Sequence, residues 1–104
     1  MAARLRYSAA AREDLGQIYR FIRDQSGSGI IALRFVRTLR QKCRDLAAAP
    51  ITMGRPRRDL RPDLRSHPVG NYIIFFRYIG NALEIVNVVE GHRDIEAFYG
   101  DGEP

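Results

Sequence analysis

Two amphipathic stretches joined by a Ser/Gly run are the feature that most constrains how this chain can fold. Apolar residues recur at spacings of three and four over residues 8–25, and the same spacing returns over residues 30–48. Such spacing places the apolar side chains on one face of each helix. Glycine in the run Ser26-Gly27-Ser28-Gly29 can end the first helix in the left-handed backbone conformation. The sequence therefore predicts an antiparallel helical hairpin, with Ser8 at the position of the first N-cap.

Each predicted helix has an apolar stripe and a polar side. The first stripe consists of Ala11, Leu15, Ile18, Tyr19 and Ile22, and the second of Ala32, Val36, Leu39, Cys43 and Leu46, with Phe35 beside it. Opposite the second stripe lie the cations Arg34, Arg37, Arg40, Lys42 and Arg44. A charge run of this kind is usually a solvated helix face, and we interpret it so.

Period-two patterns flank the helices. Residues 2–7 alternate Arg with apolar residues and predict a short strand, while residues 71–79 and 82–89 surround Gly80-Asn81, a two-residue hairpin turn. Residues 64–70 favour a further strand, in which Pro68 requires an edge or a bulge. The predicted fold class is α+β: an N-terminal strand, the helical hairpin and then an antiparallel sheet, in the order β-α-α-β-β-β.

The hairpin turn fixes a strand register and so sorts the side chains into two faces. The register pairs Ile79 with Ala82, Arg77 with Glu84, Phe75 with Val86 and Ile73 with Val88. One face carries Tyr72, Ile74, Phe76, Tyr78, Leu83, Ile85 and Val89 with the polar Asn87, and we expect it to cover the helices. The other carries Ile73, Phe75, Ile79, Ala82, Val86 and Val88. No predicted element covers this second face, so we expect an open apolar surface that binds a partner.

Residues 49–63 have no periodicity and contain three prolines, which is typical of a functional loop. Residues 55–65 hold five Arg against two Asp, whereas residues 90–104 hold one Arg against five acids. Proline-rich backbone holds these charges at low entropic cost. The loop arginines are our first candidates for target contact: Arg55, Arg57, Arg58, Arg61 and Arg65. A nucleic acid and an acidic protein both fit such a surface.

Composition places the chain among ordinary soluble domains. With 104 residues, 45% of them hydrophobic and 28% charged, it can bury one core, and we expect one domain over residues 1–99 with a flexible tail at 100–104. No run reaches the roughly 18 apolar residues of a membrane span. The single Cys43 cannot form an internal disulfide and has no metal-ligand spacing around it. We expect a cytoplasmic protein with no metal, no cofactor and no small-molecule substrate.

Several short motifs in order resemble the ParE/RelE toxin superfamily over nearly the whole chain. They are Ser8-Ala9-Ala10-Ala11-Arg12-Glu13-Asp14-Leu15, Leu46-Ala47-Ala48-Ala49-Pro50, Gly54-Arg55-Pro56-Arg57, Asp59-Leu60-Arg61, Leu64-Arg65-Ser66, Val69-Gly70-Asn71-Tyr72-Ile73-Ile74-Phe75-Phe76-Arg77 and Gly91-His92-Arg93-Asp94. The Gly-Arg-Pro run and the Gly-Asn-Tyr-Ile-Ile-Phe-Phe-Arg segment are typical of the ParE branch. ParE-like sequences tend to have Arg at the position of Asn87 and His at that of Glu90, so this chain has a less basic last strand.

The resemblance implies a toxin that binds DNA gyrase and traps its cleaved-DNA state, with Arg93 a further candidate for target contact. It also implies a ParD-like antitoxin whose C-terminal segment contacts the helical hairpin and a sheet edge, and operator DNA bound only through that antitoxin. The candidate antitoxin-binding residues are Leu15, Ile18, Tyr19, Ile22, Phe35, Ile73, Phe75, Val86 and Val88. On this reading no residue is catalytic.

Two alternatives stay open. The RelE branch consists of ribosome-dependent mRNA endonucleases, and Arg65, Arg93 and Tyr99 match positions of its catalytic groups. Ile73 stands where those enzymes have Arg, so part of the expected cation cluster is missing. Tyr99 with Phe98 is also explained as an aromatic clamp that packs the C-terminal turn on the sheet. The other alternative is a family member that binds its antitoxin but has lost toxicity.

Overall fold

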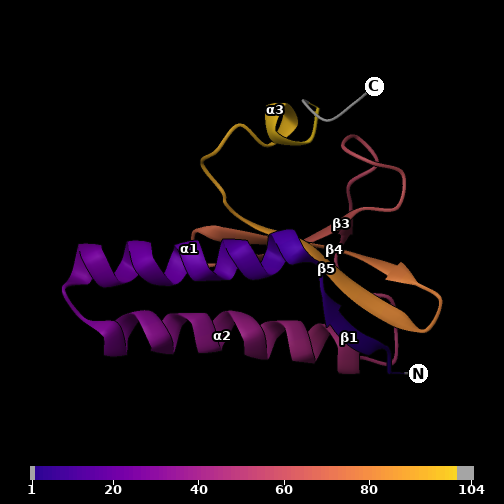
Figure 1. The fold of residues 1–104 in the computed structure, drawn as a ribbon. Helices are drawn as coiled ribbons and strands as arrows, with labels where there is room; N and C mark the ends of the chain where they lie inside the picture. The colour runs from indigo at the N-terminus through magenta and orange to yellow at the C-terminus, as the bar shows by residue number, and fades with distance from the viewer. Residues whose placement is uncertain (1, 101–104) are drawn as a thin grey trace.

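The predicted helical hairpin packs on one side of a five-stranded mixed sheet (Figure 1). The computed structural model describes residues 2–100. The elements in chain order are β1 (Arg4–Tyr7), α1 (Ala9–Ser26), α2 (Gly29–Ala48), β2 (Arg55–Pro56), β3 (Arg65–Val69), β4 (Tyr72–Ile79), β5 (Ala82–Glu90) and α3 (Ile95–Gly100). The strand order is β1-β5-β4-β3-β2, with β1 parallel to β5 and the other neighbours antiparallel. The α+β class and the order of the six predicted elements are confirmed, and β2 and α3 are additional.

The ends of both long helices have the predicted chemistry. The Ser8 hydroxyl accepts a hydrogen bond from the backbone N–H of Ala11, and Ser28 caps α2 in the same way. Gly27 ends α1 in the left-handed conformation with φ of 71°, and its N–H donates to the carbonyl of Arg23. Because these caps satisfy helix-end groups without a long connection, the two helices run back along each other.

The predicted hairpin register is correct between the Gly80-Asn81 turn and the bulge and wrong beyond the bulge. Ile79 pairs with Ala82 and Arg77 with Glu84, but a register shift between Phe75 and Phe76 leaves Val86 as an extra residue. Phe75 then pairs with Asn87, and Ile73 with Val89. A β-bulge of this kind reverses the alternation beyond it. Val88 therefore packs with the helices and Val89 on the opposite face, the reverse of the prediction.

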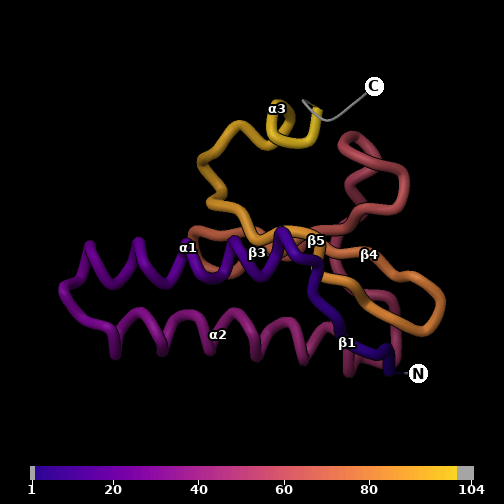
Figure 2. The backbone as a smooth tube through the Cα atoms, viewed as in Figure 1, coloured from indigo at the N-terminus to yellow at the C-terminus, as the bar shows by residue number. Residues whose placement is uncertain are grey.

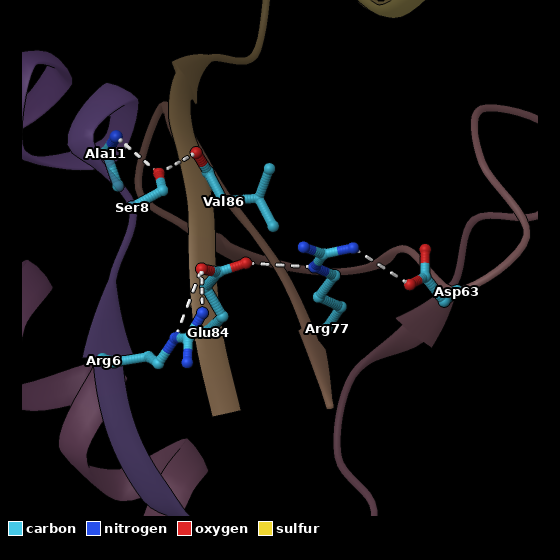
Figure 3. Close-up of polar contacts among 7 residues, drawn as sticks. All are labelled: Arg6, Ser8, Ala11, Asp63, Arg77, Glu84 and Val86. Carbon is cyan, nitrogen blue, oxygen red and sulfur yellow. Dashed lines mark hydrogen bonds and ion pairs between the residues drawn. The ribbon is translucent and has the colours of Figure 1, made fainter. Parts of the chain in front are cut away.

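Residues of the first helical segment satisfy the backbone groups that the bulge releases. The Ser8 hydroxyl donates to the carbonyl of Val86 over 2.7 Å, and the Asp14 carboxylate accepts from the N–H of Val88 over 2.9 Å. Ser8 therefore both caps α1 and holds β5, as Figure 3 shows. Unpaired buried backbone groups would each cost about 1 to 3 kcal/mol. The bulge is thus tied to the start of α1.

The second face of the sheet is covered, so the prediction of an open apolar surface there is wrong. Figure 2 shows the loop before β3 and the segment containing α3 on the side of the sheet away from the helical hairpin. Leu64, Phe75, Val89 and Tyr99 form a second buried cluster, each with at most 3% of its surface exposed. Leu60, Ile73, Val86, Ile95 and Phe98 pack around it. Neither covering segment has a helical or strand period long enough to read from the sequence.

Pro68 lies in the part of β3 that extends past β2. The two residues of β2 pair only with Arg65 and Ser66, so residues 67–69 have a strand neighbour on one side only. The predicted edge position of Pro68 is confirmed, because no strand pairs with Pro68 on the side of β3 away from β4. The predicted tail at 100–104 lies outside the described residues except for Gly100, which ends α3.

Gly54 and Gly80 provide a matched test of close packing, because both have positive φ but only Gly54 is crowded. A Cβ on Gly54 would lie 2.4 Å from Cζ of the buried Phe76, whereas one on Gly80 would have no neighbour within 4 Å. Left-handed strain costs about 1 kcal/mol, and overpacking adds about 1 to 3 kcal/mol. Gly54→Ala should therefore lower the free energy of unfolding by about 3 kcal/mol and Gly80→Ala by about 1 kcal/mol, measured by urea denaturation. Equal losses would contradict this packing account.

Candidate functional site

An apolar groove of about 670 Å³ lies between the helical hairpin and the ends of β4 and β5. Its apolar lining comes from Ile18, Phe21, Ile22, Phe35, Tyr72, Val88 and Val89, and its polar rim from Asp14, Gln17, Asn71, Glu90 and Arg93. Phe21 is 57% exposed, which is unusual for so large an apolar side chain. An open apolar groove with a polar rim is the form expected of a binding site for a helix or a strand.

Three features shape this groove. The rings of Phe35 on α2 and Tyr72 on β4 lie 5.5 Å apart at a tilt of 50°, and they close one side. Gly70, with φ of 59°, turns the chain between β3 and β4 next to Phe35, where a Cβ would lie 3.9 Å from the ring. The bulge in β5 turns Val88 toward the helices. The groove thus depends on the aromatic pair and on the altered alternation of β5.

The structure brings together only some of the candidate antitoxin-binding residues. Ile18, Ile22, Phe35 and Val88 line the groove. Leu15 is core, with 3% of its surface exposed, and Tyr19 packs against the core beside it. Ile73, Phe75 and Val86 belong to the second cluster under α3, and Phe75 has no exposed surface. These three lie away from the groove because the second face of the sheet is covered by the chain itself.

Phe21 and Tyr72 are groove residues that the sequence reasoning missed. Phe21 lies next to Ile22 on α1 but off the main apolar stripe, and a large aromatic residue at such a position was the available signal. Tyr72 was assigned to the face that covers the helices, which is correct, but its place at the open end of that face depends on the position of Gly70. Periodicity shows which side of a helix or strand is apolar. It does not show how far the helices extend over the sheet, and this decides which apolar residues stay open to a partner.

The loop arginines divide into structural and free groups. The Arg65 guanidinium donates to the carbonyls of Met53 and Gly54 over 2.7 and 2.9 Å, and it thereby closes the loop on itself. Arg57 donates twice to the carboxylate of Asp59, and its side chain is only 15% exposed. These two arginines hold the loop conformation. Each guanidinium spends two of its five N–H donors inside the loop, which fixes its position.

Arg55, Arg58 and Arg61 remain exposed at the loop surface. None of the three has an ion-pair partner among residues 2–100. The Arg61 guanidinium lies 4.9 Å from the ring centroid of Tyr99, a cation–π contact that orients it over the second cluster. Of the five predicted loop candidates, these three present cations to solvent.

A network of charged side chains fixes this loop to the sheet (Figure 3). Glu84 accepts hydrogen bonds from Arg77 over 3.0 Å and from Arg6 over 3.1 Å, and Arg77 also reaches Asp63 at the end of the loop over 3.4 Å. Burial by itself raises the pKa of Glu84, but the hydrogen bonds from Arg77 and Arg6 outweigh it and leave the pKa lowered. The predicted Arg77–Glu84 pair is confirmed as part of a larger network.

Tyr99 is buried, and Arg65 and Arg93, which match the other nuclease positions, have contacts of their own. Its hydroxyl donates to Oδ1 of Asn87 over 3.1 Å, its ring meets Phe75 edge-on at 5.0 Å, and burial raises its pKa. Arg93 lies at the rim of the apolar groove, with its guanidinium 4.8 Å from the Phe98 ring, and Arg65 is held in the loop. The aromatic clamp predicted for Tyr99 and Phe98 is confirmed.

Residues 2–100 contain no group of three or more His, Cys, Asp or Glu side chains placed to hold a metal ion. Within the same residues, no helix has both the length and the apolar character needed to cross a membrane.

Asn87 and Glu90, the two residues at which the last strand is less basic than in ParE-like sequences, have partners within the fold. Asn87 links Asp14 to Tyr99, and Glu90 accepts a hydrogen bond from the N–H of His92.

The comparisons with known proteins agree with this architecture. Residues 5–95 match the family model described as ParE toxin of type II toxin-antitoxin system, parDE. A structure described as a chromosomal ParDE toxin-antitoxin system from P. aeruginosa is similar with a TM-score of 0.74 and 22% identity, over 85% of this chain and 95% of that one. The RelBE2 toxin-antitoxin complex from Mycobacterium tuberculosis is similar with a TM-score of 0.66 and 19% identity, over 86% and 92%. No curated protein sequence matches significantly.

The strand order, the helical hairpin and these two structures define a RelE/ParE-like toxin fold. The family match covers most of the chain and distinguishes the branch. This chain belongs to the ParE toxin family of type II toxin-antitoxin systems.

The network around Glu84 predicts a pH-dependent contribution to stability. Because the folded pKa of Glu84 is lowered, its stabilisation is full above the unfolded pKa of about 4.3 and is lost as pH falls through the folded pKa. Glu84→Gln should lower the free energy of unfolding by about 1 to 2 kcal/mol at neutral pH, with the difference narrowing in acid. Chemical denaturation across this pH range measures it, with Glu96→Gln on the exposed surface of α3 as control. A Glu84→Gln deficit that stays constant in acid would refute the assignment.

Proposed function

We propose that this toxin inhibits DNA gyrase by binding it and trapping its cleaved-DNA state, without cutting RNA itself. The observation that carries the proposal is the internal use of the groups that a RelE-like nuclease would need. The Tyr99 hydroxyl is buried and bonded to Asn87, and the Arg65 guanidinium is bonded to Met53 and Gly54. A general acid or base must reach the proton that it transfers, and cations must reach the scissile phosphate. The burial of the Tyr99 hydroxyl and the fixed position of the Arg65 guanidinium inside the loop support an inhibitor that acts by binding.

Target contact is assigned to the exposed loop arginines Arg55, Arg58 and Arg61. Arginine presents several donors in a planar fork and suits carboxylates on a protein surface. The loop holds its shape through Arg57 and Arg65, and the contact between Arg77 and Asp63 fixes its end to the sheet. A cationic surface held rigidly loses less entropy on binding than a flexible one. This is the feature of the loop that supports a docking role.

We assign the apolar groove to a ParD-like antitoxin. The groove has an apolar floor between the helical hairpin and the sheet, and residues 67–69 of β3 next to it have one free strand edge. An amphipathic helix can place its apolar face in such a groove, and an extended segment can add to such an edge. The formal net charge of +5 also favours an acidic antitoxin segment by speeding its approach. Operator DNA would then be read by the antitoxin.

The gyrase proposal is tested with a triple substitution in the loop. Arg55→Gln, Arg58→Gln and Arg61→Gln together should raise the toxin concentration for half-inhibition of gyrase supercoiling at least about tenfold, equivalent to about 1.4 kcal/mol. The matched control replaces Arg4, Arg12 and Arg20, three exposed arginines of β1 and α1, by Gln, and it should inhibit like the parent protein. No inhibition by micromolar parent protein, together with mRNA cleavage in a translation extract, would overturn the proposal.

The antitoxin assignment is tested with two exposed apolar residues. Phe21→Asp places a charge in the groove, whereas Ile51→Asp places one at a position that is 69% exposed and outside the groove. Because both side chains are largely exposed, neither change should unfold the toxin. Phe21→Asp should weaken binding of the antitoxin encoded beside the toxin by about 2 kcal/mol or more, measured by calorimetry, and Ile51→Asp should leave it unchanged. Equal affinities for the two variants would exclude the groove as the site.

A further inference from the structure

The outer face of α2 carries a continuous row of arginines that the proposed function does not use. Residues 34–44 hold five cations and no acid. Arg34, Arg37, Arg40 and Arg44 are exposed and border one shallow depression, which Thr38 and Gln41 complete. Their spacing of three and four residues puts them on the side of the helix opposite the buried stripe of Val36, Leu39 and Cys43. The sequence-based interpretation of this face was a solvated surface.

None of these four arginines forms an ion pair with any residue of 2–100. Two of them are nevertheless held in place. The Arg40 guanidinium lies 5.1 Å from the ring centroid of Tyr7, and Arg44 donates to Oε1 of Gln41 over 2.8 Å. The nearby acid Asp45 accepts from the amide of Gln41. The face thus presents four cations, two of them held in place, whose charge is not neutralised by an ion pair within residues 2–100.

We propose that this face of α2, the row Arg34, Arg37, Arg40 and Arg44, binds the phosphate backbone of duplex DNA without reading its sequence. The row spans ten residues, or about 15 Å at about 1.5 Å per residue. One strand of B-DNA presents about four phosphates over this length, at about 3.4 Å of axial rise each. A single convex helix also fits a duplex surface, since an α-helix is about as wide as the major groove.

Charge complementarity favours phosphates over an acidic protein at this face. All six side chains that border the depression are polar, so a peptide would find no apolar anchor between the arginines. The apolar groove suited to a peptide is on another face, lined by Phe35 of the same helix. Figure 1 places α2 at the opposite end of the molecule from α3 and the loop before β3. A protein bound at the loop and a DNA segment bound at α2 would therefore not compete for space.

The inference goes beyond the proposed function and does not require gyrase. Its test measures fluorescence anisotropy of a labelled duplex of about 20 base pairs, of arbitrary sequence, between about 50 and 200 mM salt. The full chain should bind with a Kd on the order of 10⁻⁵ M at the lower salt, and log K should fall with log salt with a slope of roughly −3 to −4. No binding of the parent protein at low salt would overturn the proposal.

Two variants with the same loss of charge localise the contact. Arg34→Gln, Arg37→Gln and Arg44→Gln together should weaken binding at least about tenfold and make the salt slope less steep by roughly 0.9 for each contact removed. The triple Gln variant of Arg4, Arg12 and Arg20 should bind nearly as the parent does, with circular dichroism confirming that both variants fold. Equal weakening in both would mean that only net charge matters, which would overturn the proposal. A Glu-rich peptide tests the competing possibility of an acidic protein. If the α2 variant lost binding to this peptide but still bound the duplex as the parent does, the proposal would be overturned.

Discussion

A β-bulge leaves the carbonyl of Val86 and the N–H of Val88 without partners in the β4–β5 ladder, and Ser8 and Asp14 supply those partners. These two bonds and the packing of Ala11, Leu15 and Ile18 on the sheet together place α1. The bulge also turns Val88 toward the groove and lets Asn87 join Asp14 to Tyr99, so that groups on both sides of the sheet are connected. One extra residue in a strand thus contributes Val88 to the groove on one side of the sheet and the Asn87–Tyr99 bond on the other.

The features that are predictable from the sequence are the periodic and local ones, and contacts between distant parts of the chain are not predictable from it. Helical spacing, the Ser8 cap and the Gly27 terminus predict the hairpin correctly, because each is a local property. The strand register is predictable from the Gly80-Asn81 turn only as far as the bulge. Beyond it, strict alternation gives the wrong side for Val88. The bulge depends on Ser8 and Asp14, which are more than seventy residues away in the chain.

The site shows the same division. Ile18, Ile22 and Phe35 were expected to bind a partner and lie in the groove, because an apolar stripe on a helix predicts its own face. Phe75 was expected to be open and is buried under Tyr99, because a six-residue helix has no period to reveal it. The sequence shows how many arginines the loop contains but not which of them bind within the loop. Only the contacts of Arg57 and Arg65 distinguish those that hold the loop from those that face solvent.

The pairing of β1 with β5 constrains how this toxin is made. The strand β1 pairs with a strand that is made much later in synthesis, with Tyr7 beside Ile85. The α1–α2 hairpin needs only local contacts and can form early, whereas the β1–β5 pairing must await synthesis of β5. A nascent chain would thus present the helical side of the groove before it contains a finished toxin.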